Sequence, residues 1–293
     1  MQGRRLLMHG VACALAFAAA AWPQGVGVQG QPQQGWAVRA SLDNPNAKLY
    51  NTAKQKLFDG KQIYGYTISK LNPKLYCEVA PHWDFIWFEM QHSTMSYRDV
   101  EEMIAACPRV GIPILRVPDE FESTLQKAGD IGLLGVVIPT VDTVEKAMAA
   151  ARYARFPPVG RRSTGTGQAR SIWEVNGINY RQTLNDNMLV IAQIETPVGV
   201  SNALPIAMVP GIDVILASTG DMSNFSGLEA KDPEYQTLIT RIHDATLKAG
   251  KFLGAVPASY GKPGPPGVGR TDHADWRFFY NGPSFDGYQP PKQ

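Results

Sequence analysis

The chain has 293 residues, of which 44% are hydrophobic and 18% are charged, and this balance excludes a disordered or fibrous protein. The formal net charge is +2 and there is no run of basic residues, so nothing indicates nucleic acid or an anionic membrane as a partner. The length suits one compact α/β domain of barrel size, and the composition favours a small-molecule partner.

The amino-terminal segment is typical of a secretory signal. Arg4 and Arg5 precede an apolar stretch, residues 6–20, which is too short to span a bilayer and ends in small residues. We therefore expect residues 1–22 to be a cleaved signal peptide, so that the protein is exported, periplasmic or secreted, and has no stable membrane anchor. Residues 23–48, rich in Gln and Gly, are expected to form a flexible lead into the domain.

Residues 49–260 alternate between short apolar runs and segments of helical periodicity. Strands and helices in strict turn predict parallel strands joined by right-handed crossovers. Seven such units are visible, and a closed (β/α)8 barrel is the natural completion. The predicted strands are 63–68, 84–88, 112–117, 135–139, 188–195, 213–217 and 252–256. The predicted helices are 73–79, 97–107, 122–130, 144–154, 198–208 and 235–249.

The carboxyl-terminal segment, residues 261–293, is atypical because Pro, Gly and aromatic residues are frequent in it. Residues 276–280 could form strand eight. The proline-rich tail that follows leaves no room for a regular final helix.

The three cysteines differ in their expected roles. Cys13 lies in the predicted signal and would be lost with it. Cys77 and Cys107 fall on successive predicted helices, and in an exported protein they can form a disulfide. Two buried free thiols are an equally good interpretation. Neither cysteine has the spacing of a metal site.

Polar side chains follow four of the predicted strands. His92 follows the second strand, Arg116 ends the third, and Glu195 and Asp221 are expected to end the fifth and sixth. The carboxyl ends of parallel barrel strands share one face, so these groups should converge there. Gln193 lies two residues before Glu195 and therefore on the same strand face. Two carboxylates on neighbouring strands predict a divalent-cation site.

Each of these residues also has a structural interpretation. Glu195 could be an acid at a helix amino terminus, and Asp221 could cap the turn that follows it. Arg116 could form a structural ion pair at the rim, and His92 could be a hydrogen-bonded rim histidine. The repetition of a carboxylate after two neighbouring strands favours metal binding for that pair.

Five separated motifs resemble those of the HpcH/HpaI family of pyruvate-dependent class II aldolases. The resemblance runs from about residue 51 to about residue 256 and keeps the motifs in order. It implies a TIM barrel of the phosphoenolpyruvate/pyruvate type. The motifs are Glu89-Met90-Gln91-His92, Arg116-Val117-Pro118, residues 152–162, Gln193-Ile194-Glu195-Thr196 and Gly220-Asp221-Met222-Ser223.

The resemblance implies how the 2-oxo acid would be bound. Glu195 and Asp221 match the metal-binding carboxylates of the family, and a ligand set made only of oxygen atoms favours Mg²⁺ or Mn²⁺. Gln193 and the backbone around Gly220 match the contacts to the substrate carboxylate. The cation would also take the carboxylate and keto oxygens of the 2-oxo acid.

The resemblance also implies catalytic roles. Arg116 matches the arginine that stabilises the enolate oxygen, and His92 matches the acid/base histidine, with Glu89 expected to hold its tautomer. Asp130 matches an aspartate that reaches into a neighbouring subunit's site, which implies a homo-oligomer. The family usually has Asp in place of Glu89 and Glu in place of Gln91, so the support of the histidine differs here.

The sequence therefore predicts a divalent-metal-dependent aldolase, a carbon–carbon lyase. It would cleave or form a 4-hydroxy-2-oxo acid through a pyruvate enolate, with an aldehyde as the other partner. A related lyase acting on an acyl-CoA or oxaloacetate-type substrate is the second interpretation. A 2-oxo acid binding protein without turnover is the third.

Overall fold

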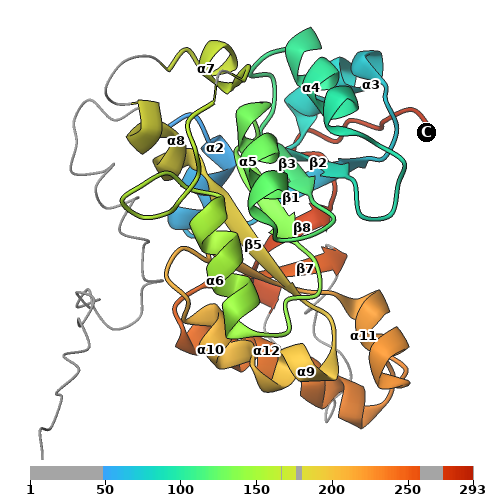
Figure 1. Cartoon of the computed structure of the whole chain (residues 1–293). Helices are drawn as coiled ribbons and strands as arrows, with labels where there is room; N and C mark the ends of the chain where they lie inside the picture. The colour runs from blue at the N-terminus through green and yellow to red at the C-terminus, as the bar shows by residue number, and fades with distance from the viewer. Residues whose placement is uncertain (1–48, 166, 176–179, 258–272, 293) are drawn as a thin grey trace, which may run out of the picture.

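The computed structural model describes residues 49–165, 167–175, 180–257 and 273–292. The predicted signal peptide and flexible lead therefore lie outside the described residues. Eight parallel strands pair in chain order and close into a barrel, with the helices arranged around it (Figure 1). The expectation of a TIM-like (β/α)8 barrel is confirmed.

All eight strands lie close to their predicted ranges, including the last one. Strands β2 to β6 are buried along their whole length, because side chains fill the barrel on one face and helices cover the other. The strands are β1 (Ile63–Ile68), β2 (Phe85–Glu89), β3 (Pro113–Arg116), β4 (Gly135–Ile138), β5 (Leu189–Ile194), β6 (Val214–Ala217), β7 (Phe252–Pro257) and β8 (Trp276–Asn281).

Local sequence signals fix several helix starts. Helix α4 begins at a capping box in which the Ser96 hydroxyl and the Asp99 carboxylate satisfy each other's backbone N–H groups. Four of the α-helices were not predicted from the sequence: α2, α7, α8 and α11. The helices are α2 (Thr52–Phe58), α3 (Pro73–Val79), η1 (Ala80–His82), α4 (Tyr97–Ala106), α5 (Glu122–Asp130), α6 (Val144–Tyr153), α7 (Ala169–Ile172), α8 (Tyr180–Asn187), α9 (Pro197–Ser201), α10 (Ala203–Ala207), α11 (Thr219–Ser226), α12 (Pro233–Lys248) and η3 (His273–Asp275).

The single helix predicted over residues 198–208 is wrong, because two short helices replace it. Helix α9 ends at Ser201, and α10 begins after Asn202. Pro205 has no N–H group and cannot donate to the carbonyl of Ser201, so a continuous helix would lose a hydrogen bond at this point.

Buried charges close the amino-terminal end of the barrel. Arg155 pairs with Asp213 at 2.7 Å, just before β6. Lys54 on α2 is fully buried and donates to the carbonyl of Met188 at 2.8 Å. Burial lowers the pKa of Lys54 to about 8, although the charge of Asp213 opposes this. These groups lie at the opposite end of the barrel from the carboxyl ends of the strands, so we assign them a role in stabilising the fold.

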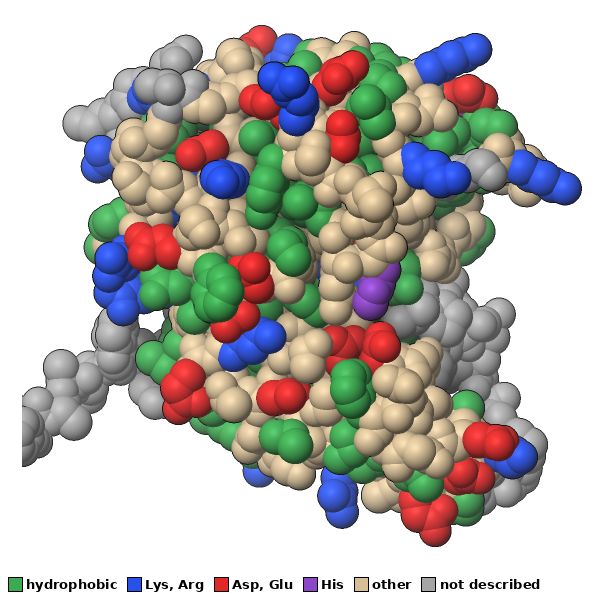
Figure 2. Space-filling view, turned by 45° about the vertical axis from the view of Figure 1, so that its right-hand side comes forward, with side chains coloured by type: hydrophobic (Ala, Val, Ile, Leu, Met, Phe, Trp, Pro, Cys, Tyr) green, Lys and Arg blue, Asp and Glu red, His purple; other side chains and the backbone are tan. Residues whose placement is uncertain are grey.

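A tail without a helix follows β8 in the described residues 282–292 and packs beside β1 and the segment before β2. The ring of Tyr288 stacks on His82 with centroids 4.0 Å apart. The indole nitrogen of Trp83 donates to the carbonyl oxygen of Gly282 at 2.9 Å. A cavity of about 260 Å³ remains between this tail and β1. No helix in the described part of the chain is long and apolar enough to cross a membrane. The face of the molecule drawn in Figure 2 carries acidic and basic side chains mixed with hydrophobic ones.

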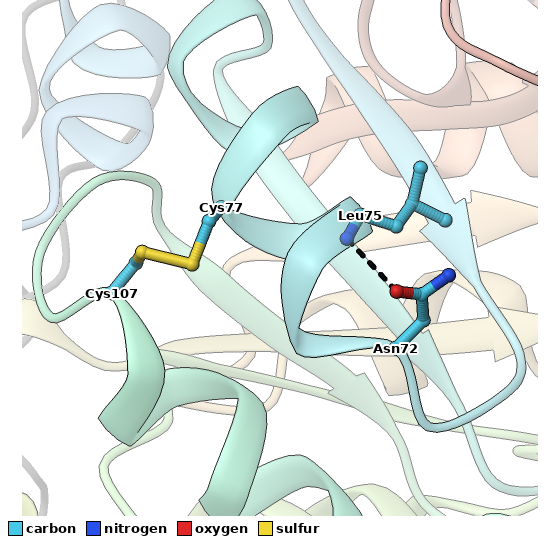
Figure 3. Close-up of a disulfide and its surroundings, with 4 residues drawn as sticks. All are labelled: Asn72, Leu75, Cys77 and Cys107. Carbon is cyan, nitrogen blue, oxygen red and sulfur yellow. Dashed lines mark hydrogen bonds between the residues drawn. A yellow bond between two sulfur atoms is a disulfide. The ribbon is translucent and has the colours of Figure 1, made fainter.

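A disulfide joins Cys77 on α3 to Cys107 at the end of α4 (Figure 3). The structure thus selects the disulfide over the two free thiols. The cysteines are 30 residues apart, and the closed loop contains β2 and the segment from Glu89 to His92. The cross-link therefore encloses one corner of the barrel mouth.

We expect removal of this cross-link to destabilise the fold. The Cys77→Ser/Cys107→Ser variant should lose about 3 to 4 kcal/mol of unfolding free energy, because a loop of this length regains chain entropy when it is opened. Denaturant unfolding of both proteins, with and without dithiothreitol, measures the difference. The double variant should not respond to the reductant. Equal stability of oxidised and reduced wild type would contradict the expectation.

Candidate active site

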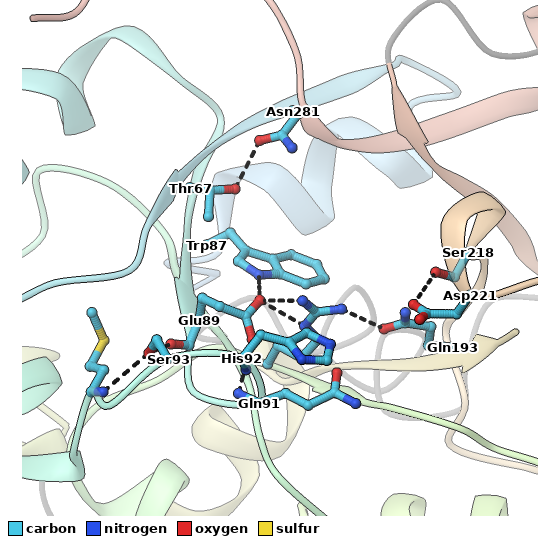
Figure 4. Close-up of polar contacts among 12 residues, drawn as sticks. Thr67, Trp87, Glu89, Gln91, His92, Ser93, Gln193, Ser218, Asp221 and Asn281 are labelled. Atoms are coloured by element: carbon cyan, nitrogen blue, oxygen red, sulfur yellow. Dashed lines mark hydrogen bonds and ion pairs between the residues drawn. The ribbon is translucent and has the colours of Figure 1, made fainter. Parts of the chain in front are cut away.

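The carboxyl ends of β2 and β3 contribute a buried ion pair. The Nε atom of Arg116 donates to Glu89 Oε2 at 2.7 Å, and a terminal guanidinium nitrogen lies 2.6 Å from the same oxygen. The indole nitrogen of Trp87 donates to this oxygen at 3.0 Å (Figure 4). Both charged side chains are more than nine-tenths buried. The pair orients Arg116, whose remaining terminal nitrogen makes only a 3.5 Å contact with Gln193.

The end of β5 presents Gln193 and Glu195 to the same region. The Gln193 amide donates to Glu195 Oε2 at 2.5 Å, which agrees with the prediction that the two side chains share a strand face. The other Glu195 oxygen accepts from the backbone N–H and the hydroxyl of Thr140, both at 2.7 Å. Thr140 has a φ of 48°, and this turn after β4 directs both donors at the carboxylate. Glu195 is therefore held in one orientation.

Asp221 lies in the first turn of α11 and not at a strand end, which corrects the predicted placement. Ser218, the residue before that helix, donates its hydroxyl to Asp221 at 3.1 Å. The carboxylates of Glu195 and Asp221 lie close enough to interact directly. Burial raises the pKa of Glu195, the hydrogen bonds from Thr140 lower it, and the charge of Asp221 raises it again.

The two carboxylates fit a divalent cation chemically. Glu195 is almost fully buried beside a second negative charge, and this arrangement is costly unless a proton or a cation is shared. Among the described residues, no group of three or more His, Cys, Asp or Glu side chains is placed to hold a metal ion. The chain thus offers two oxygen ligands, and Mg²⁺ is often bound by one or two carboxylates with substrate and water completing its shell.

Gly220 follows Thr219 at the start of α11, and its Cα faces open space, since a Cβ built there would meet nothing within 4 Å. The first backbone N–H groups of a helix have no partner inside the helix. The side chain of Ser218 does not cap them, because its hydroxyl binds Asp221 instead. An anionic carboxylate group is favoured at such a helix start.

His92 is exposed, and its imidazole has no hydrogen-bond partner among the described residues. The prediction that Glu89 holds its tautomer is wrong. One Glu89 oxygen accepts from the backbone N–H groups of Gln91 and His92, and the other binds Arg116. In the view of Figure 4 the His92 ring extends in the direction of Gln193. Glu89 therefore fixes the backbone of the histidine and makes no hydrogen bond to its ring.

Asp130 is at the end of α5 and has a partner in its own chain. Its carboxylate accepts from Arg162 at 2.7 Å, and the Arg162 side chain is almost fully buried. The described contacts thus give Asp130 a structural role within the subunit. A fifth of its side chain remains exposed.

Four residues of this region were not singled out from the sequence: Trp87, Thr140, Ser218 and Tyr280. Thr140 and Ser218 lie within two residues of the ends of β4 and β6, and a polar residue at that position is the signal that could have found them. Trp87 lies two residues before Glu89 and shares its face of β2, which is the same pattern that pointed to Gln193.

Known proteins with this fold and these motifs identify the family. The HpcH/HpaI aldolase/citrate lyase family matches residues 72–256, and the chain belongs to it. A 2-keto-3-deoxy-L-rhamnonate aldolase from Shigella sonnei is 30% identical over 221 residues, which cover 72% of this chain and 82% of that protein. The chain is accordingly an aldolase-type lyase by family.

Solved structures agree on the fold. An HpcH/HpaI aldolase from Desulfitobacterium hafniense superposes with a TM-score of 0.66 at 23% identity, covering 77% of this chain and 88% of that one. An HpcH/HpaI aldolase/citrate lyase family protein from Burkholderia cenocepacia gives a TM-score of 0.67 at 24% identity, covering 78% of this chain and 91% of that one. At this identity the likeness concerns the fold alone.

Proposed function

We propose that this protein is a divalent-metal-dependent aldolase that cleaves or forms a 4-hydroxy-2-oxo acid through a pyruvate enolate. The observation that carries the proposal is that the buried carboxylate of Glu195 is accompanied by that of Asp221, whose charge raises the pKa of Glu195. Gln193 links Glu195 to the guanidinium of Arg116. Family membership supports the reaction class. The relative from Shigella sonnei, an aldolase named for a 2-keto-3-deoxy acid, supports a 2-oxo acid as the substrate.

The chain's own groups suit the two ends of such a substrate. Glu195 and Asp221 would hold Mg²⁺ or Mn²⁺, which when bound stabilises negative charge on a keto oxygen. The backbone N–H groups at Gly220 and the amide of Gln193 would orient the substrate carboxylate. Arg116 would add a planar, permanently charged donor at the enolate oxygen.

Cleavage of the 4-hydroxy-2-oxo acid starts at its C4 alcohol. The base takes the proton of the C4 alcohol, the C3–C4 bond breaks, and its electron pair becomes the enolate of pyruvate. The C4 oxygen becomes the carbonyl of the released aldehyde, and a proton on C3 completes pyruvate. His92 is our candidate for the base, because an imidazole nitrogen can accept and release a proton and because the side chain is exposed at the carboxyl end of β2.

We further propose that the protein acts as an exported homo-oligomer. The disulfide between Cys77 and Cys107 supports export, because disulfides persist in oxidising compartments. In such an oligomer the exposed part of Asp130 would face a neighbouring subunit. The size of the purified protein in solution, by light scattering, tests the assembly.

Exchange of the pyruvate methyl protons in D₂O tests the proposed function. We expect wild type with Mn²⁺ or Mg²⁺ to exchange these protons without any aldehyde, because enolate formation needs only the 2-oxo acid half. EDTA should abolish the exchange, and added Mn²⁺ should restore it. Exchange that persists in EDTA would remove the metal from the proposal. Pyruvate binding without exchange would instead support a 2-oxo acid binding protein.

A further inference from the structure

The last strand brings an aromatic side chain into the barrel. On β8, Phe278 stacks on Phe85 with ring centroids 4.6 Å apart, and a Cβ added to Gly65 would lie 2.2 Å from the Phe85 ring, so this layer fills the lumen. Side chains two apart on a strand share a face. Tyr280 therefore also faces the lumen, one layer nearer the mouth, and it stacks on Trp87 with centroids 4.4 Å apart and planes at 23°.

Trp87 connects Tyr280 to the catalytic region. Its indole is fully buried and donates to Glu89, and the guanidinium carbon of Arg116 lies 5.5 Å from the ring centroid. The ring of Tyr280 is thus fixed by the Trp87 indole, which is itself held by Glu89 and Arg116. A hydroxyl on so constrained a ring loses little conformational entropy when it binds a ligand.

The hydroxyl of Tyr280 is an available hydrogen-bond donor. This hydroxyl has no hydrogen-bond partner among the described residues, and the side chain is only half-buried. Burial raises its pKa, as do the charges of Glu89, Asp221 and Glu195, while Arg116 opposes them. The phenol therefore stays protonated at neutral pH and lies within the electrostatic reach of all four groups.

The barrel leaves one side of the mouth for the aldehyde half of the substrate. Arg116 on β3, Glu195 after β5 and Asp221 after β6 are assigned to the 2-oxo acid half. In the closed strand order β8 and β1, which pair with each other, lie across the barrel from β4 and β5. At its rim the hydroxyl of Thr67 donates to the side chain of Asn281 at 2.9 Å, above Trp87 in Figure 4.

We propose that Tyr280 is a further catalytic residue, whose hydroxyl donates a hydrogen bond to the C4 oxygen of the 4-hydroxy-2-oxo acid. The Tyr280 and Trp87 rings then form the wall on which the aldehyde half packs. This role rests on the proposed function. The C4 oxygen gains negative charge as its proton leaves, and the phenol stabilises that charge without giving up its own proton.

The Tyr280→Phe variant separates the two halves of the reaction. We expect kcat/KM for cleavage of a 4-hydroxy-2-oxo acid to fall on the order of 10²-fold, the loss typical of one donor to a developing oxyanion. Exchange of pyruvate methyl protons in D₂O should change no more than a few-fold, since it involves no C4 oxygen. The matched control is Tyr64→Phe, on the outer face of the neighbouring strand β1, which should match wild type in both assays.

The outcomes are distinct. If Tyr280→Phe cleaves as fast as wild type, or loses exchange as fully as cleavage, the role of Tyr280 at the C4 oxygen is overturned. If wild type neither exchanges nor cleaves, the proposed function itself fails. A second variant, Tyr280→Leu, removes the wall and should change the relative kcat/KM for aldehydes of different length in the addition direction. If the order of kcat/KM among the aldehydes is unchanged, the Tyr280 and Trp87 rings do not form the wall on which the aldehyde half packs.

Discussion

Asp221→Asn is expected to abolish measurable Mn²⁺ binding and to lower turnover by roughly 10³-fold or more. One of the two carboxylate ligands is lost, and metal-assisted charge stabilisation contributes several kcal/mol to such reactions. The fold should survive, because Asp221 is only partly buried in the first turn of α11. Isothermal calorimetry with Mn²⁺ gives the affinity, and the cleavage assay gives the rate.

The metal-free stability of this variant adds an independent readout. The charge of Asp221 raises the pKa of Glu195, so the two carboxylates repel each other when no cation is present. Removing one charge should leave the thermal midpoint in EDTA unchanged or higher. Glu195→Gln should also lose Mn²⁺ binding, and the exposed Glu145→Gln on α6 serves as a control that keeps it. Unchanged Mn²⁺ affinity in both site variants would refute the metal assignment.

Arg116→Lys is expected to lower kcat/KM on the order of 10²-fold while the protein stays folded. The guanidinium gives two N–H groups to one oxygen of Glu89 and directs a third nitrogen toward Gln193. An ammonium group keeps the charge but cannot serve both directions from one planar fork. Steady-state kinetics and pyruvate proton exchange should fall together, because the arginine is assigned to the enolate oxygen.

A comparison with Glu89→Gln separates catalysis from structure. If Arg116 only neutralises Glu89, then Arg116→Lys should change stability more than rate, and Glu89→Gln should behave like wild type in turnover. We expect the opposite for Arg116→Lys, namely a large loss of turnover rate and only a small shift of the thermal midpoint. Turnover within a few-fold of wild type would remove Arg116 from the mechanism.

The sequence predicted the barrel well because its signals are local and repeated. Each strand is an apolar run between turn residues, and the alternation with helices constrains the topology to parallel pairing. Even β8 was found, although its aromatic residues and the tail are atypical. The pair of Gln193 with Glu195 follows directly from strand periodicity.

Other features depend on contacts that periodicity does not encode. Four short helices, α2, α7, α8 and α11, were missed, and α11 moves Asp221 from a strand end into a helical turn. The partner of Glu89 was misjudged, because sequence neighbours suggested His92 whereas the next strand supplies Arg116. Thr140 reaches Glu195 across 55 residues of sequence, through a backbone conformation that no spacing rule predicts. The choice between disulfide and free thiols also needed the three-dimensional distance.

The tail after β8 has a consequence for how the barrel can move. Other strands are covered by helices, whereas the tail, residues 282–292, lies over β1 and the segment before β2. It is held there by one ring stack, one ion pair and a few hydrogen bonds. A segment held by so few contacts can open locally while the strands stay folded. Tyr280 faces the lumen on the other side of the barrel wall, so local opening of the tail should uncover the outer face of β1 while the candidate site keeps its shape.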